Sequence, residues 1–351
     1  MKERTKDLLK DSFGSLVSNN RAISAAKTAP IWLTLIIFLL SVLLPVIPVT
    51  VFYANQKGSQ FINANSFGLE KTIPWLTFNM QKENKGLVLN DMKEFTFENA
   101  DSSTPDYIYV NKNTEQEELR VFFAGLKDIE SQKAFIKEVA EYKVLLKEAD
   151  EEAGTKATYY IPSFMVFFNN AFALQVYAPG TDVVMKGSSM SGDYKAFKPN
   201  ENILEDFITV KDIEKNKPTT DNEIKALLAD GSYCKGVFNN FKKFLDTTYT
   251  TAKNKGILFG TLIFAGVYLG MSLIMAFLIW VLTRGKNNPF NYMSFLTTFK
   301  IESWIALCPA LIGLAFGFIL GKDITIMMLC FIAPLGLRSM VLMTKQLRPM
   351  E

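Results

Sequence analysis

The sequence predicts an α-helical membrane protein with four transmembrane helices and an inserted extracytoplasmic α+β domain between helices 1 and 2. Three observations predict this fold class: long apolar stretches, a polar block between the first two, and basic residues in the short flanking segments. Each stretch is long enough to cross a hydrocarbon core of about 30 Å, which takes about 20 helical residues. The stretches are Ile31–Tyr53, Ile257–Leu282, Ile301–Leu320 and Ile324–Met343.

The distribution of charge predicts which side of the membrane each segment faces. The first 30 residues carry six Lys and Arg against three Asp and Glu, whereas residues 54–256 carry 25 basic against 29 acidic residues. Further basic residues flank the later helices: Arg284, Lys286, Lys300, Arg338, Lys345 and Arg348. Since basic residues in short segments mark the cytoplasmic side, we expect a multi-pass cell-membrane protein with both termini in the cytoplasm.

The chain is therefore expected to divide at the ends of the four spans. The segments are a basic cytoplasmic leader (1–30), helix 1 (31–53), the extracytoplasmic domain ending in a stalk helix (54–256), helix 2 (257–283), a cytoplasmic interfacial loop (284–300), helix 3 (301–320), helix 4 (324–344) and a cytoplasmic tail (345–351). Apolar residues of the leader recur at helical spacing, which favours an amphipathic helix on the inner leaflet; an irregular basic leader is the alternative.

Helix 1 is expected to stay in the membrane. Bulky residues at 51–53 suit signal peptidase poorly, and the apolar run is long for a signal peptide, although a cleaved signal peptide is the alternative. Pro45 and Pro48 predict a kink near the outer end of this helix.

Within the inserted domain, short runs of β-forming residues precede helical patterns, which predicts an α+β fold. The expected strands are Gly86–Leu89, Phe95–Phe97, Tyr107–Val110, Leu119–Phe123, Tyr159–Phe168 and Phe172–Tyr177. One helix is expected from Ile129 to about Glu152 after an N-cap at Asp128. A second is expected from near Asp221 to a break at Asp230, and a third from Ser232 into helix 2.

The stretch Ala157–Thr181 contains no charged residue, so a fifth span is an alternative for it. Pro162 and the pair Asn169-Asn170 interrupt the stretch, and an odd number of spans would place the basic tail outside. We therefore expect two strands around an Asn-Asn turn, forming a central hairpin with one face on the core. A hairpin whose edge dips into the membrane is the remaining alternative.

Composition excludes several classes of chemistry. The chain has no histidine, which removes Ser-His and Cys-His nucleophile pairs and imidazole metal ligands. No Walker A sequence or glycine-rich dinucleotide loop occurs. Ser232 and Lys235 match S-x-x-K without its companion motifs, and the acidic run at 148–152 lacks the alternating ligands of a calcium loop. We therefore expect a non-enzymatic protein without cofactor, metal or nucleic-acid partner.

The cysteines bear on the compartment of the inserted domain. Of the three cysteines, only Cys234 lies in this domain, so no intramolecular disulfide can stabilise it. A disulfide-free exported domain, in a chain with many Lys, Asn, Phe and Ile residues, is typical of a low-GC Gram-positive bacterium.

Two ionisable residues lie inside the predicted spans. Glu302 begins helix 3 and Arg338 lies in helix 4, both near the inner edge of the hydrocarbon layer. Such groups usually face a partner or a cavity. One hypothesis is an ion pair between antiparallel neighbours, with a contribution of about 1–2 kcal/mol. The alternative is that each side chain extends separately to the interface.

Two further features are candidate contact surfaces. Gly313, Gly317 and Gly321 repeat every four residues along one face of helix 3, which permits close approach of this chain's own helices or of another subunit. The cytoplasmic segment before helix 3 presents the aromatic residues Phe290, Tyr292, Phe295 and Phe299, which indicate either a docking surface or an aromatic belt at the interface.

The layout resembles a Gram-positive membrane protein family of unknown function that gene context links to maltodextrin utilisation. A basic leader with Phe13 precedes one span and an α+β domain, and the link Phe290–Phe299 (FNYMSFLTTF) precedes the third helix. The inserted domain is longer than is usual in that family. The resemblance implies an accessory role near carbohydrate uptake and supplies no catalytic residues.

These observations lead to a ranked set of expectations. The first is an accessory or regulatory membrane protein that contacts the lipid bilayer and other membrane subunits, with a carbohydrate (maltodextrin) ABC transporter as the expected complex. The second is a sensor whose extracytoplasmic domain binds a ligand or cell-wall component and signals through a partner. A transporter is disfavoured because the four helices offer almost no polar lining residue.

Overall fold

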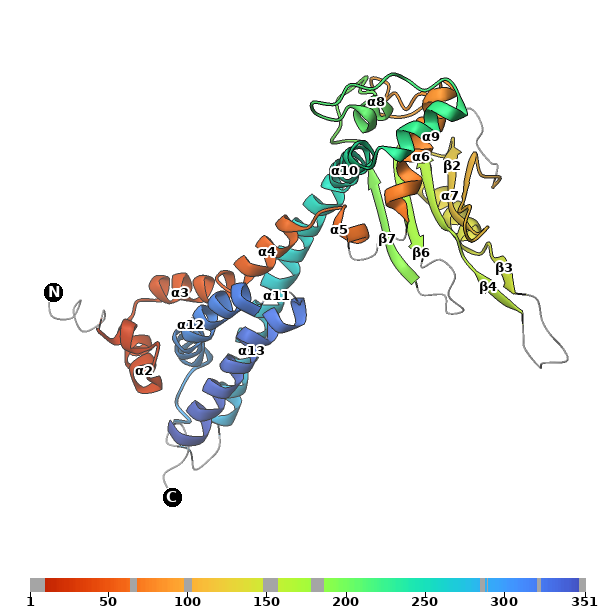
Figure 1. The fold of residues 1–351 in the computed structure, drawn as a ribbon. Coiled ribbons are helices and arrows are strands. Elements are labelled where there is room, and N and C mark those ends of the chain that lie inside the picture. Colours follow the sequence, from red (N-terminus) through yellow and green to blue (C-terminus); the bar gives the residue numbers. More distant parts are fainter. Residues whose placement is uncertain are drawn as a thin grey trace. The chain divides into compact units, whose positions relative to one another are not determined.

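The computed structural model describes residues 10–63, 68–97, 103–147, 157–177, 186–284, 288, 290–320 and 323–346 (Figure 1). The chain forms two compact units. We call Met1–Asn55 with Asn254–Glu351 the helical unit, and Gln56–Lys253 the inserted domain.

The helical unit contains four segments that are long and apolar enough to span a membrane: Ile31–Asn55, Thr250–Leu282, Phe295–Leu320 and Ile324–Thr344. These agree with the four predicted spans and fit a multi-pass membrane protein. Their helices are α3 (Ile31–Leu43), α4 (Val46–Asn55), α11 (Thr250–Leu282), α12 (Phe295–Leu320) and α13 (Ile324–Val341), followed by the π-helix η1 (Leu342–Gln346). The first span is divided at Leu44 and Pro45, where a proline without an N–H interrupts the helix as expected.

The α12 helix is the centre of the helical unit. Trp304 and Ile305 are buried against the alanine face of α2 (Asn19–Thr28), which includes Ala22 and Ala26. On another side α12 packs against α3 and α13. The leader thus contributes a short alanine-rich helix, whereas Phe13 and Val17, expected on an amphipathic face, are 74% and 89% exposed.

The α12 helix also begins earlier than predicted. Ser294 Oγ accepts a hydrogen bond from the N–H of Thr297 at 3.2 Å, which caps a first turn starting at Phe295. Residues 295–300 therefore belong to this helix, and the predicted interfacial loop 284–300 is shorter than expected.

The inserted domain is built on a five-stranded sheet with the order β1-β2-β5-β6-β7 (Figure 1). Its strands are β1 (Tyr107–Val110), β2 (Glu117–Ala124), β5 (Ser163–Phe168), β6 (Ala171–Tyr177) and β7 (Lys186–Asp193). All neighbouring strands are antiparallel except β2 and β5, which are parallel. The connection from β2 to β5 contains α7 (Ile129–Ala140) and a separate two-stranded sheet of β3 (Val144–Lys147) and β4 (Thr158–Tyr160). The expected α+β fold is confirmed.

The predicted central hairpin is present, but β5 and β6 are covered on both faces and not on one face as expected, which explains why the stretch is uncharged. Met165 and Phe167 pack into one core with α6 (Leu69–Lys82) and α10 (Gly231–Thr248). Phe164 and Val166 point to the other face, where they meet α7. A strand buried on both sides has apolar residues at every position, and β5 follows this pattern.

Several local predictions differ from the structure. Gly86–Leu89 and Phe95–Phe97 are not strands; Val88 forms only an isolated bridge to Asn202, and the Phe95 ring packs on Tyr194. The helix after Asp128 ends at Ala140 instead of about Glu152. The predicted strand Tyr159–Phe168 is split near Pro162 into β4 and β5, which belong to different sheets.

Among the described residues, four elements of the inserted domain lie where no helix or strand was predicted. They are the short helix α5 (Gln60–Asn63), α6, the edge strand β7 and the short helix α8 (Ile203–Ile208). Strand β3 lies where a helix was expected. The expected helix from Asp221 is α9 (Asp221–Ala229), with a complete capping box between Thr220 and Glu223.

Candidate functional site

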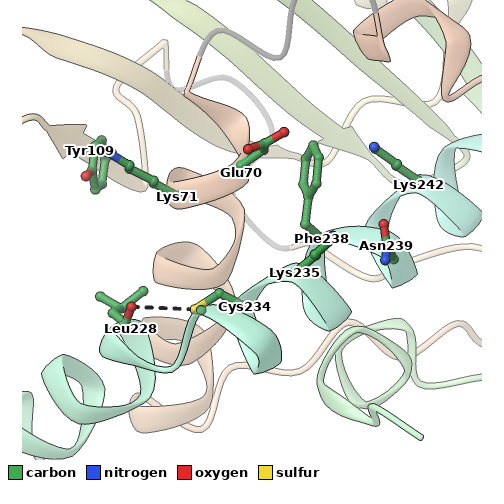
Figure 2. Close-up of a pocket in the computed structure, with 10 residues that line it drawn as sticks. Glu70, Lys71, Tyr109, Leu228, Cys234, Lys235, Phe238, Asn239 and Lys242 are labelled. Carbon is green, nitrogen blue, oxygen red and sulfur yellow. Dashed lines mark hydrogen bonds between the residues drawn. The ribbon is translucent and has the colours of Figure 1, made fainter.

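A pocket of 650 Å³ opens on the inserted domain where the first turn of α6, strand β1 and the corner between α9 and α10 meet (Figure 2). We call it the lysine pocket. It is lined by Glu70, Lys71, Tyr109, Leu228, Gly231, Cys234, Lys235, Phe238, Asn239 and Lys242. Its volume lies within the range of small-molecule sites, about 300–1,000 Å³.

Helix α10 supplies one wall of the pocket. Its N-cap is Asp230, whose Oδ1 accepts the N–H of Tyr233 at 3.0 Å, so the helix starts directly at the pocket edge. Cys234, Phe238 and Lys242 follow at intervals of four residues and therefore share one face. The N–H of Tyr233 and the ammonium of Lys215 hold the pKa of Asp230 below its usual range.

The opposite wall comes from α6 and β1. Glu70 and Lys71 lie in the first turn of α6, and Figure 2 shows Lys71 beside Tyr109 and Glu70 on the same side as Phe238. Desolvation by burial, followed by the charge of Glu118, raises the pKa of the Tyr109 phenol. Tyr109 is therefore a neutral hydrogen-bonding group at ordinary pH.

The charge of the pocket is positive. It contains three lysines and one glutamate, and Lys242 Nζ lies 4.7 Å from the centroid of the Phe238 ring. Within the described residues, none of the three ammonium groups lies within 4.0 Å of a carboxylate. The pocket therefore offers uncompensated cations beside an apolar floor, which suits an anion with an apolar portion.

The pocket cysteine is not an activated nucleophile. Burial, followed by the charge of Asp230, raises the pKa of the Cys234 thiol, so the thiol stays protonated at neutral pH. Its Sγ donates to the carbonyl of Leu227 at 3.4 Å. Ser232, the first residue of the S-x-x-K match, is exposed and is not the N-cap, a role that Asp230 fills.

The two predicted intramembrane partners do not form an ion pair. Glu302 is 1% exposed, and its Oε2 accepts a hydrogen bond from Ser339 Oγ at 3.2 Å. Arg338 donates instead to Asn19 Oδ1 and to the carbonyl of Ile305, both at 3.0 Å. The two side chains are thus held by different neighbours, because oxygens of the leader and of α12 occupy the guanidinium.

The glycine face of α12 packs inside the helical unit. A Cβ at Gly313 would lie 3.0 Å from Pro45 Cβ, and one at Gly317 would lie 2.7 Å from Pro48 Cγ. The two glycines therefore admit the proline-containing segment of the first span, in line with the own-bundle alternative. Gly321 lies outside the described residues.

The four predicted docking aromatics do not share one exposed surface. Phe299 packs on Phe38 with ring centroids 4.9 Å apart, and Phe290 packs against the core around Trp304. Tyr292 and Phe295 are 71% and 42% exposed. The acidic run at 148–152 lies outside the described residues, and the described residues contain no group of three or more metal-ligating side chains.

The lysine pocket was not predicted from the sequence. The spacing of Cys234, Phe238 and Lys242 along α10 is a usable signal for a mixed polar and apolar helix face. Glu70, Lys71 and Tyr109 come from distant parts of the chain, and no pattern in the sequence brings them to that face.

Comparison with known proteins adds no further assignment. No protein-family model matches the chain, and no curated protein or solved structure is significantly similar to it.

Proposed function

We propose that this chain is a multi-pass membrane protein that binds a small anionic ligand in the lysine pocket and acts as a receptor or accessory protein without catalysis. The observation that carries the proposal is the group of three lysines without ion-pair partners among the described residues, placed around an apolar floor. The membrane assignment rests on the four apolar helices.

The proposed orientation follows from the basic flanks. With both termini in the cytoplasm, the inserted domain and its pocket lie outside the cell, where they meet solutes and wall components. The absence of histidine from the chain and the protonated thiol of Cys234 support a binding role over an enzymatic one.

The charge of the pocket narrows the class of ligand. A phosphate or carboxylate can accept hydrogen bonds from Lys235 and Lys242, while the apolar part of the ligand lies against Leu228 and Phe238. An uncharged maltodextrin, the carbohydrate that gene context links to the family the layout resembles, would leave these ammonium groups without a counter-charge. We therefore place a phosphorylated or carboxylated small molecule ahead of a neutral sugar.

The test compares charged and uncharged probes on the full-length protein in nanodiscs. We expect glucose 6-phosphate and citrate to bind and to bind more weakly as salt rises, with glucose and maltotriose much weaker. The double variant Lys235→Gln/Lys242→Gln should reduce affinity for the anions by about tenfold or more, the scale of a lost charge-assisted contact.

Lys243→Gln is the matched control, because Lys243 lies on α10 outside the pocket and donates to Asn240 Oδ1. Equal binding of charged and uncharged probes, or equal loss in the control, would contradict the proposal.

The accessory role is the second candidate. The α11 helix exposes a run of apolar side chains, with Phe259 and Ile263 59% and 62% exposed, and this face can contact lipid or another subunit. Purification from the native membrane in mild detergent, followed by mass spectrometry, tests this role. Stoichiometric transporter subunits would support it, and recovery of the chain alone would count against it.

A further inference from the structure

A groove of 590 Å³ lies in the helical unit between the leader, the middle turns of α12 and the C-terminal turns of α13. We call it the Arg338 groove. Its lining includes Ser18 and Asn19 of the leader, Pro309 of α12, and Pro334 and Leu337 of α13. All of these residues belong to the same compact unit.

The proline in α12 explains why an arginine is held there. Pro309 has no N–H, so the carbonyl of Ile305, four residues earlier, lacks its helical donor. The guanidinium of Arg338 supplies that donor through Nη1 at 3.0 Å. The cation is thus fixed at a proline site of the neighbouring helix.

The other partners of Arg338 come from the leader. Nε donates to Asn19 Oδ1 at 3.0 Å, Nη2 donates to the carbonyl of Ser15, and Asn19 Nδ2 returns a bond to the carbonyl of Arg338 at 3.3 Å. Leader, α12 and α13 therefore meet at one guanidinium.

All three oxygens that accept from Arg338 are neutral. Among the described residues, no carboxylate lies within 4.0 Å of the guanidinium, and Glu302 bonds to Ser339 instead. A guanidinium has five N–H groups, of which three donate to these oxygens, and the Cys308 side chain in the groove lining is a further hydrogen-bond partner. An anion beside a half-buried cation in a membrane span would stabilise it further than neutral carbonyls do, and the described protein places no carboxylate at contact distance.

The wall of the groove is apolar and continuous with the exposed surface of α13. Leu337 is 65% exposed and Val341 43% exposed, and both line the groove. The groove thus combines the Arg338 guanidinium, near one end of α13, with apolar side chains beside it.

We propose that the Arg338 groove binds one anionic phospholipid, with its phosphodiester on the guanidinium and an acyl chain along Ile312 and Pro334, which lie on the side of Arg338 away from the near end of α13. This occupant supplies the missing negative charge and covers the apolar wall at once, which a free phosphate ion does not. Basic pockets between transmembrane helices hold anionic headgroups by the same physical means. The inference is independent of the lysine pocket and requires only that the helical unit lies in a membrane.

The experiment is native mass spectrometry of the full-length protein, loaded in detergent with equimolar phosphatidylglycerol and phosphatidylcholine. We expect one phosphatidylglycerol to be retained preferentially. Arg338→Gln should lower the retained fraction by about tenfold, as expected for loss of a charge-assisted contact. Arg284→Gln, which removes a cation that does not line the groove, should leave retention unchanged.

A second variant separates lipid binding from folding. Leu337→Trp fills the groove from an exposed position without removing the arginine, and should also lower retention, whereas Met340→Trp, equally exposed on α13 but outside the lining, should not. Equal retention of the two lipids by the wild type would overturn the proposal. Displacement of the lipid by millimolar inorganic phosphate, or unchanged retention in both Arg338→Gln and Leu337→Trp, would also overturn it.

Discussion

Close packing of α12 on the first span can be tested with a matched pair of glycines. A Cβ at Gly317 would lie 2.7 Å from Cγ and 2.9 Å from Cβ of Pro48, whose ring cannot rotate away. A Cβ at Gly266 of α11 would meet nothing within 4 Å. Both substitutions to Ala gain about the same helix propensity, about 1 kcal/mol, so their difference isolates the steric contact.

The expected difference follows from the cost of overpacking, about 1–3 kcal/mol. Taking about 2 kcal/mol, Gly317→Ala should unfold about 4–8 °C below Gly266→Ala. The assay is thermal unfolding of the full-length protein with a thiol-reactive dye on a Cys234→Ser background. In that background Cys308 of α12 and Cys330 of α13, both half-buried, report opening of the helical unit.

The reasoning fails if Gly317→Ala and Gly266→Ala unfold at the same temperature. That result would mean that the first span does not approach α12 at Pro48, and that the glycine face is free for lipid or another subunit. Gly313→Ala provides an intermediate case, since its Cβ would lie 3.0 Å from Pro45 Cβ.

Two further predictions concern the inserted domain. Phe244 is 4% exposed and contacts the rings of Phe167, Phe172 and Phe207, so Phe244→Ala should cost about 4 kcal/mol. Pulse proteolysis in urea should then show a midpoint lowered by about 2 M, whereas Met92→Ala at a 76% exposed site should shift it little; equal shifts would refute the core assignment. The pKa of Asp230 is lower in the folded domain than in the unfolded chain. The ionised carboxylate therefore stabilises the fold at pH values above the ordinary Asp pKa, and this contribution is lost as the pH falls through the pKa of the folded state. Asp230→Asn should therefore be less stable than the wild type at neutral pH and equally stable at the acid limit, and a pH-independent difference would contradict the linkage.

The spans were predictable because a membrane imposes one strong requirement, namely continuous apolar residues over about 20 positions. The central hairpin was predictable for a related reason: an uncharged run with a polar turn leaves few other solutions. By contrast, β7 has the sequence KGSSMSGD, in which Met190 is the one large apolar residue, and its place in the sheet comes from pairing with β6. An edge strand of this kind has no signal in its own sequence.

The errors at α7 and in the helical unit have the same origin. Tyr142 and Leu146 continue the helical spacing after Ala140, yet the chain turns there to pair Val144 with Tyr160, a partner distant in sequence. Likewise, an ion pair between Glu302 and Arg338 was one of two hypotheses, because they are the charged residues of their predicted spans; the other was that each side chain extends separately to the interface. Two of the three oxygens that accept from Arg338 are backbone carbonyls, one of them freed by Pro309, and the third is the side-chain Oδ1 of Asn19. Backbone groups are present at every residue, so the sequence does not single them out.

The position of α10 at the end of the inserted domain affects how this domain can form during synthesis. Phe241 and Phe244 of α10 are part of the same core as Leu119, Met165 and the α6 helix. The ribosome makes α10 after every strand of the sheet, and α11 follows at Thr250. Since α6 is made before the strands, one face of the sheet has part of its cover early and lacks the α10 part until the last helix of the domain has emerged.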